Sequence, residues 1–193
     1  MGQAARQEEP FYTRDEYLRL EEQVERKSEY YNGELFAMSG GSFNHSVICV
    51  NWLWKLRDAL TNTPCVVFDS NMKVEISRRN TFLYPDVMVV CGKPEFVEGR
   101  TDILKNPIMI IEVLSPGTEG FDRIKKFAYY QTLPSLQEYV LAAQDEARVE
   151  TYQKQTEQSW IYTVAEGLDA VISLRSLGVE CSLREIYHKT IWE

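Results

Sequence analysis

Residues 107–117 read Pro107-Ile108-Met109-Ile110-Ile111-Glu112-Val113-Leu114-Ser115-Pro116-Gly117, an apolar run that a single acid interrupts. Such a nearly continuous run predicts a strand at about 108–115 that lies inside a covered sheet. Residues 115–117 end it, because proline and glycine favour turns. Glu112 is unusual in this place, since an unpaired carboxylate is costly to bury. We therefore expect a cation beside Glu112, either a lysine or a metal ion.

A second acid follows a proline at residues 84–87, Tyr84-Pro85-Asp86-Val87. These residues lie in another apolar run, which predicts a strand at 81–91. Proline lacks the N–H that a sheet interior needs, so it is confined to edges, bulges and bends. The strand is therefore expected to lie at an edge, or to be bulged or bent, at Pro85. A bend would aim Asp86 outward.

A helix predicted over about 119–132 carries Asp122 and Lys126, which share one face because they are spaced i, i+4. If this helix packs back over the strand ends, Lys126 reaches Glu112. Two alternatives stay open. An ordinary surface pair is the interpretation we favour for Asp122, and Glu112 with Lys126 could be a buried ion pair without a catalytic role.

The remaining elements are predicted from local signals. Thr13 and Glu16 form a capping box, so a first helix runs from about residue 14 to the mid-20s. Asn32-Gly33 predicts a hairpin between 29–31 and 34–38. After a break at 39–42, apolar spacing predicts a largely buried central helix with Trp52 and Trp54 in the core. Tyr129 is also expected in the core. Further strands are expected at about 65–69, 71–77, 137–143, 147–154 and 159–164, and a short helix from Ser182.

Length and composition favour one α/β (α+β mixed) domain over residues 1–193, with 1–10 as a flexible leader. The element order predicts a mixed central β-sheet flanked by helices, with an N-terminal helix and hairpin and extra C-terminal antiparallel strands. Four cysteines in apolar runs, at 49, 65, 91 and 181, are read as buried thiols. A reducing cytoplasm fits them, and no apolar run is long enough to span a membrane.

A formal net charge of −8 disfavours a nucleic-acid enzyme, because phosphate binding usually needs a basic surface. The acidity is concentrated at 1–35 and 131–193. Over residues 70–130 Lys and Arg nearly balance Asp and Glu. The charge therefore counts only mildly against nucleic acid as the substrate.

In their order and spacing, the motifs resemble the PD-(D/E)XK nuclease superfamily and, within it, the Uma-two family of restriction endonucleases. The resemblance covers most of the chain. It implies a restriction-endonuclease-like core in which Asp86 and Glu112 bind magnesium or manganese and activate a water. The backbone carbonyl of Val113 could add a metal ligand. The motifs are residues 31–34, His45, residues 84–87, residues 111–116, Asp122 with Lys126, and residues 136–141.

One position departs from the superfamily pattern. Leu114 stands where the signature lysine is expected, two positions after Glu112. The Uma-two pattern moves the lysine to the following helix, which maps to Lys126, with Lys125 as a weaker substitute. Such a lysine would stabilise charge on the phosphate or orient the attacking water, work that depends on the position of the ammonium group.

The resemblance also suggests accessory residues and a function. Glu34, His45 and Asp122 are the accessory candidates, although Glu34 follows a turn and His45 is more simply a hydrogen-bonded residue at a helix start. The expected function is a metal-dependent endonuclease that hydrolyses phosphodiester bonds of DNA, acting as a two-fold homodimer. The alternatives are an inactive, nuclease-derived binding scaffold and a metal-dependent hydrolase of a smaller phosphorylated substrate.

Overall fold

The computed structural model describes residues 10–115, 117 and 119–192. The flexible leader expected at 1–10 lies outside them, apart from Pro10. Helix α1 (Arg14–Glu21) begins at the predicted capping box of Thr13 and Glu16. It is shorter than predicted and ends at Glu21, whose carboxylate accepts hydrogen bonds from the Ser28 amide and the Tyr84 hydroxyl.

The predicted hairpin is confirmed as β1 (Ser28–Tyr31) and β2 (Glu34–Ala37). Both turn residues have positive φ, 46° at Asn32 and 109° at Gly33, which is the requirement of a type I′ turn. The hairpin belongs to a five-stranded sheet in the order β2-β1-β5-β4-β7. The other members are β5 (Thr81–Leu83), β4 (Lys73–Ile76) and β7 (Ile103–Leu104).

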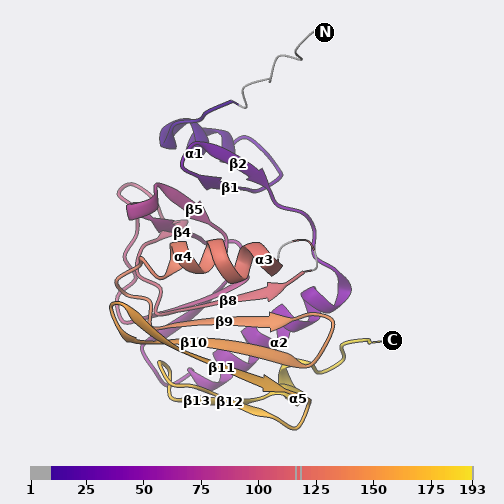
Figure 1. Ribbon diagram of the computed structural model, residues 1–193. Helices are drawn as coiled ribbons and strands as arrows, with labels where there is room; N and C mark the ends of the chain where they lie inside the picture. Colours follow the sequence, from indigo (N-terminus) through magenta and orange to yellow (C-terminus); the bar gives the residue numbers. More distant parts are fainter. Residues whose placement is uncertain (1–9, 116, 118, 193) are drawn as a thin grey trace.

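A six-stranded mixed sheet forms the centre of the molecule, as predicted, in the order β11-β10-β9-β8-β6-β3. Strands β8 and β9 pair in parallel and the other pairs are antiparallel. Figure 1 shows this sheet with β8, β9, β10 and β11 side by side. The strands are β11 (Ser159–Glu166), β10 (Arg148–Thr156), β9 (Glu138–Ala143), β8 (Met109–Leu114), β6 (Val87–Cys91) and β3 (Cys65–Asp69).

The strand predicted over 81–91 is wrong as a single element. Residues 81–83 form β5 in the five-stranded sheet, and residues 87–91 form β6 in the six-stranded sheet. Pro85 lies in the gap, where its missing N–H removes no ladder bond. The chain therefore passes from one sheet to the other at Pro85, and Asp86 lies at the start of β6.

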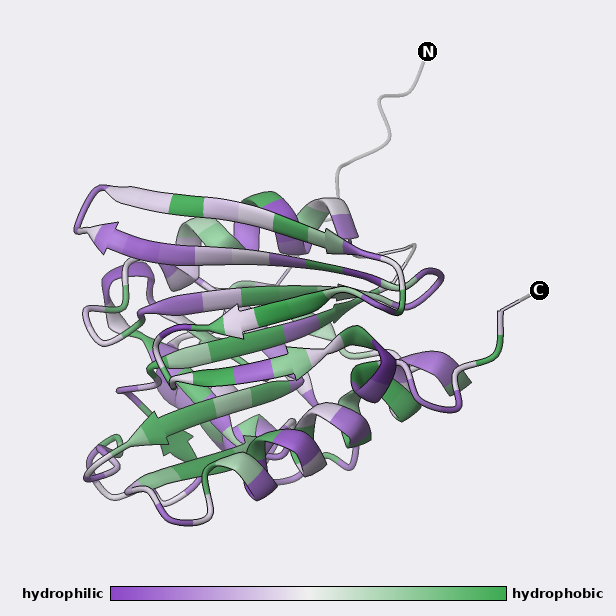
Figure 2. Cartoon of the chain, turned by 90° about the horizontal axis from the view of Figure 1, so that it is seen from below, coloured by the Kyte–Doolittle hydropathy of each residue, from purple (hydrophilic) through white to green (hydrophobic). Residues whose placement is uncertain are grey.

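Helices cover both faces of the six-stranded sheet (Figure 1). On one face lies α2 (Phe43–Ala59), which packs Ile48, Trp52 and Leu56 against the strands. The prediction of a largely buried central helix was wrong for its outer face, where Val50 and Trp54 are 62% and 64% exposed. Hydrophobic colouring is concentrated in the strands through the middle of Figure 2.

The helix predicted over 119–132 lies on the other face, between the two sheets. It consists of α3 (Glu119–Phe121), the π-helical turn η2 (Asp122–Lys126) and α4 (Phe127–Tyr130). In η2 the amide of Phe127 donates to the carbonyl of Asp122, five residues back. Single π-turns of this kind occur frequently at functional sites.

The C-terminal region adds elements that local signals did not predict. A two-stranded sheet of β12 (Val171–Leu174) and β13 (Val179–Ser182) packs below α2 in the main core. The predicted short helix is α5 (Leu183–Ile186), capped by Ser182.

A 3-10 turn, η1 (Ser77–Arg79), joins β4 to β5. None of the described helices is long and apolar enough to cross a membrane.

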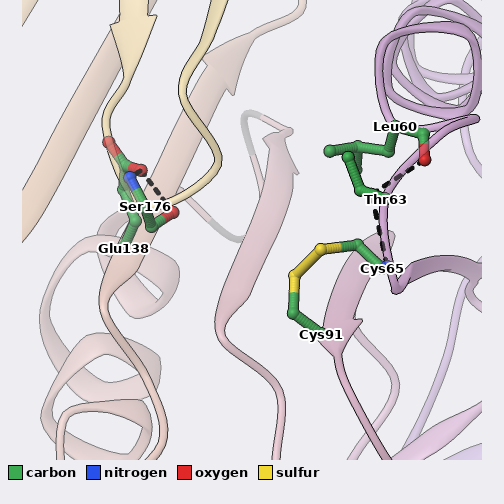
Figure 3. Close-up of a disulfide and its surroundings, with 6 residues drawn as sticks. All are labelled: Leu60, Thr63, Cys65, Cys91, Glu138 and Ser176. Atoms are coloured by element: carbon green, nitrogen blue, oxygen red, sulfur yellow. Dashed lines mark hydrogen bonds between the residues drawn. A yellow bond between two sulfur atoms is a disulfide. The ribbon is translucent and has the colours of Figure 1, made fainter.

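Two of the four cysteines are not thiols, which corrects the prediction. Cys65 and Cys91 face each other as a register pair of β3 and β6 and form a disulfide (Figure 3). Cys49 and Cys181 are free. The prediction of a reducing cytoplasm rested on four free thiols and so loses that support, since disulfides persist mainly in oxidising compartments.

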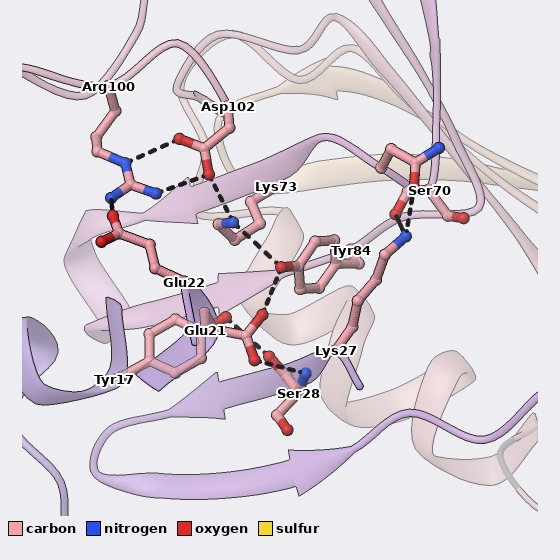
Figure 4. A network of polar contacts seen from close by, with 11 residues as sticks. Tyr17, Glu21, Glu22, Lys27, Ser28, Ser70, Lys73, Tyr84, Arg100 and Asp102 are labelled. Carbon is pink, nitrogen blue, oxygen red and sulfur yellow. Dashed lines mark hydrogen bonds and ion pairs between the residues drawn. The ribbon is translucent and has the colours of Figure 1, made fainter. Parts of the chain in front are cut away.

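A network of polar side chains joins α1 to the five-stranded sheet (Figure 4). The Lys73 ammonium lies 2.7 Å from an Asp102 oxygen and 3.1 Å from the Tyr84 hydroxyl, which donates to Glu21. Arg100 binds both oxygens of Asp102 and also contacts Glu22. We call this set the α1 network: Glu21, Glu22, Lys73, Tyr84, Arg100 and Asp102.

Candidate functional site

Strand register brings the two predicted metal ligands together. β6 and β8 are antiparallel, and their pairing ends with Val87 opposite Ile111, so Asp86 and Glu112 are the next residues on either side of this end of the ladder. The charge of Asp86 is close enough to raise the pKa of Glu112. The Val113 amide donates a hydrogen bond of 2.8 Å to Asp86 Oδ2, which fixes that carboxylate beside β8.

Alternation along β8 decides which way Glu112 points. Its neighbours on the same face, Ile110 and Leu114, lie in the core between the two sheets, so Glu112 faces α4 and η2. There the Tyr130 hydroxyl donates to Glu112 Oε1 at 2.7 Å, and Lys126 Nζ lies 3.2 Å from the same oxygen. Glu112 is 3% exposed and has the cation that the sequence required.

Lys126 contacts two further acids. Its Nζ lies 3.2 Å from Glu29 of β1 and 3.4 Å from Asp122. The favoured interpretation of Asp122 as half of a surface pair was wrong, because both Asp122 and Lys126 are buried. The π-turn keeps both side chains on the inner face of the helix. Leu114, at the superfamily's lysine position, is buried in the core, and Lys125 is exposed, so Lys126 supplies the charge.

Sequence reasoning missed Glu29. It is 8% exposed, and the Tyr31 hydroxyl donates to it at 2.7 Å. The only available signal was period-two alternation, which places Glu29 and Tyr31 on one face of β1. The accessory candidate Glu34 differs from it: Glu34 is exposed at the start of β2 and does not line the cavity described below.

His45 connects the site to α2. The Ser42 side chain caps this helix by accepting from the His45 amide, which fixes the ring beside Asp86. His45 Nε2 lies 3.2 Å from Asp86 Oδ2, and Nδ1 lies 3.6 Å from Cys49 Sγ. Burial is the largest influence on the pKa of His45 and lowers it, but the hydrogen bond to Asp86 and the charges of Asp86 and Asp122 together raise the pKa overall.

These side chains line a cavity of about 390 Å³. Among the described lining residues are four carboxylates, which we call the carboxylate cluster: Glu29, Asp86, Glu112 and Asp122. Lys126 and His45 are the basic residues of the same lining. Phe36, Met38 and Phe121 make part of the wall apolar.

The described residues that line the cavity include more acids than bases, because four carboxylates share it with Lys126 and His45. Burial raises the pKa of Glu112 well above its ordinary value, and Asp86, Asp122 and Glu29 raise it further, although Lys126 opposes them. Burial lowers the pKa of Lys126, but the surrounding carboxylates, Glu112 first, raise it overall. Hard oxygen donors gathered in a reachable cavity fit Mg²⁺ or Mn²⁺. Asp86 and Glu112 would hold such an ion.

Comparisons with known proteins agree with this fold. Two proteins of Synechocystis are similar over most of their length: sll1609 is 39% identical over 160 residues, which is 83% of this chain and 90% of the relative. The other, slr1290, is 33% identical over 178 residues, 92% of each chain. Both are described as uncharacterized.

A crystal structure from Anabaena variabilis, titled "a putative nuclease belonging to DUF820", superposes with a TM-score of 0.77. It is 21% identical and covers 93% of this chain and 99% of its own, so the likeness concerns the restriction-endonuclease-like fold. The Uma2 family model, described as "Putative restriction endonuclease", matches residues 14–184. That match runs from α1 into α5, and the protein therefore belongs to the Uma2 family.

Proposed function

We propose that this protein is a metal-dependent endonuclease that hydrolyses phosphodiester bonds of DNA, with Mg²⁺ or Mn²⁺ held by Asp86 and Glu112. The observation that carries the proposal is the carboxylate cluster, in which four acids share one cavity with a single lysine. Family membership supports a nuclease. The Val113 carbonyl is a further candidate ligand, since its amide already fixes Asp86.

A bound divalent ion would lower the pKa of a coordinated water and offset the charge of the phosphate. The protein's own groups would do the rest. Lys126, held in place by Glu112, Glu29 and Asp122, would present its ammonium to the negative charge that develops on the phosphate. His45 orients the Asp86 carboxylate through its Nε2 contact. Tyr130 fixes one oxygen of Glu112.

Cleavage of supercoiled plasmid in Mg²⁺ or Mn²⁺ tests the proposal. Asp86→Asn, Glu112→Gln and Lys126→Met should each lower the rate on the order of 10²-fold or more. Glu29→Gln should also slow the reaction, whereas Glu34→Gln on the same hairpin should match wild type, because Glu34 lies outside the cavity. Full activity in the Asp86 and Glu112 variants would refute the mechanism.

Cutting both strands of a duplex needs two such sites, which a two-fold homodimer would supply. Sedimentation of the active protein on a short duplex tests this part. A wild-type protein that binds DNA, yet leaves plasmid and single strands uncut in both metals, would instead be the inactive scaffold.

Two observations favour a second candidate, a hydrolase of a smaller phosphorylated substrate. The net charge of −8 and a cavity of only about 390 Å³ suit a small molecule better than a duplex. The salt dependence of binding distinguishes DNA from a small phosphorylated substrate. DNA binding should weaken steeply as salt rises, because counterions are released from the phosphates, whereas a small substrate should respond little.

A further inference from the structure

We infer that His45, Cys49 and Asp86 form a binding site for a thiophilic divalent ion such as Zn²⁺, next to the proposed magnesium ligands and sharing Asp86 with them. One ligand atom from each of these residues lies within 4.8 Å of the other two. All three side chains are partly accessible rather than sealed in the core. No other use of Cys49 follows from the proposed function.

The helix prearranges two of the ligands. His45 and Cys49 are spaced i, i+4 on the first turns of α2, so their side chains lie one above the other, with 3.6 Å between Nδ1 and Sγ. Asp86 approaches from the start of β6, with Oδ2 3.2 Å from Nε2, the other ring nitrogen. Only one nitrogen of His45 can bind the ion, and one ligand atom from each of the three residues lies within 4.8 Å of the others. Ligands of a tetrahedral zinc ion at about 2.0–2.3 Å are themselves roughly 3 to 4 Å apart, so side-chain movements of about an ångström bring the three together.

The donor set distinguishes this site from the proposed magnesium site. An imidazole nitrogen, a thiolate and one carboxylate oxygen are ligands that Zn²⁺ and Co²⁺ prefer, whereas Mg²⁺ takes oxygen donors. Three protein ligands beside a cavity leave a fourth position for water, the arrangement of an open zinc site. The two kinds of ion would therefore compete for Asp86.

Binding must release a proton. A free thiol has a pKa of about 8.5, so the sulfur of Cys49 is mainly protonated at neutral pH before the ion binds. When the ion binds, the S–H bond breaks, the sulfur–metal bond forms and the proton passes to the buffer. A divalent cation placed among these acids compensates for that cost, because it favours the thiolate.

Spectroscopic titration with Co²⁺ alone tests the site without any assay of cleavage. Wild type should develop a thiolate-to-cobalt charge-transfer band that Zn²⁺ abolishes. The band can come only from Cys49 or Cys181, since the other two cysteines form the disulfide. Cys49→Ser and His45→Ala should therefore lose it. Cys181→Ser and Glu112→Gln should keep it, because neither residue belongs to the triad.

A wild-type titration without a charge-transfer band up to millimolar Co²⁺ would overturn the inference, as would a band that survives Cys49→Ser. Competition for Asp86 has a consequence that rests on the proposed function: Zn²⁺ should inhibit magnesium-dependent cleavage, and Cys49→Ser should require more Zn²⁺ for the same fractional inhibition. If wild type shows the band but cuts no DNA, the proposed function fails and the zinc site stands. If it cuts DNA without the band, the reverse holds.

Discussion

Two polar networks meet at residues 84–86 and differ in their charge balance. In the α1 network, Lys73 and Arg100 are shared among acids that are partly exposed, such as Glu22, whose side chain is 58% exposed. In the carboxylate cluster, Lys126 is shared among acids that are nearly all buried. The first network can stabilise the fold by itself. Among the described residues, the second network has four carboxylates against Lys126 and His45, and this excess of acids indicates a site that binds a further cation.

The largest difference should appear when each network loses its lysine. Lys126→Met leaves buried carboxylates without their cation and should lower the free energy of unfolding by about 3 kcal/mol. Lys73→Met should cost about 1 kcal/mol, because Arg100 still binds Asp102. Urea denaturation of both variants measures the difference. Equal losses of unfolding free energy would mean that the two lysines contribute equally to stability, which would contradict the comparison.

Divalent ions should act on one network only. Mg²⁺ at about 100 times its Kd should stabilise wild type by about 2.7 kcal/mol, since it binds the folded state alone. Glu112→Gln should lose this gain, whereas Asp102→Asn, the matched change in the α1 network, should retain it. Thermal unfolding of the three proteins with and without Mg²⁺ measures this stabilisation. A gain that persists in Glu112→Gln would place the ion elsewhere.

The two networks should respond to pH with opposite signs in the metal-free protein. Arg100 and Lys73 lower the pKa of Asp102, so Asp102 stabilises the folded protein at pH values above its ordinary pKa of 3.8. This stabilisation is lost as the pH falls below 3.8. The pKa of Glu112 is raised by burial, so stability is lost as the pH rises above 4.5 toward the folded-state pKa.

Each titration is worth at most about 1.4 kcal/mol per pH unit, and less for Asp102 because solvent screens it. Urea denaturation of wild type, Asp102→Asn and Glu112→Gln at a series of pH values on both sides of 4 separates the contributions of Asp102 and Glu112 to stability. Asp102→Asn should flatten the acid side of the profile, and Glu112→Gln the side above pH 4.5. A single slope shared by all three proteins would contradict the assignment.

The smallest effect concerns the glycine pair before α2. A Cβ at Gly41 would lie 2.8 Å from His45 Nδ1, whereas one at Gly40 would meet nothing within 4 Å. Gly41→Ala should therefore cost about 1 kcal/mol and move the ring that contacts Asp86, and Gly40→Ala should stay within about 0.5 kcal/mol. The urea midpoints of Gly41→Ala and Gly40→Ala measure this difference in stability. If the two variants behave alike, the ring has more freedom than its contacts indicate.

Local chemistry made much of the fold predictable. The capping box at Thr13, the helix start at Ser182 and the Asn32-Gly33 turn depend on interactions within a few residues, and the structure confirms these predictions. Pro85 predicted an edge, bulge or bend in one strand, but the prediction that this strand continues past the proline was wrong, because the choice between sheets depends on distant partners. The Cys65–Cys91 disulfide was missed for the same reason: its residues meet only when β3 pairs with β6.

The site was predictable where a residue broke a local rule. Glu112 in an apolar strand and Asp86 after a proline were both conspicuous, and both line the same cavity in the structure. Glu29 was not, because an acid next to a hairpin turn is ordinarily solvated, and only packing of β1 against η2 buries it. Asp122 was misjudged since its spacing from Lys126 is the same in a surface pair.

The π-turn η2 makes this protein more sensitive to chain length than to composition between residues 122 and 126. Each residue advances an α-helix by about 100°. Deleting one residue there would swing the ammonium of Lys126 toward solvent and leave Glu112 without it, whereas exchanging Ile124 or Lys125, both exposed, would leave the register intact. Natural variation in this segment should therefore exchange residues 124 and 125 freely, while the number of residues between 122 and 126 stays constant.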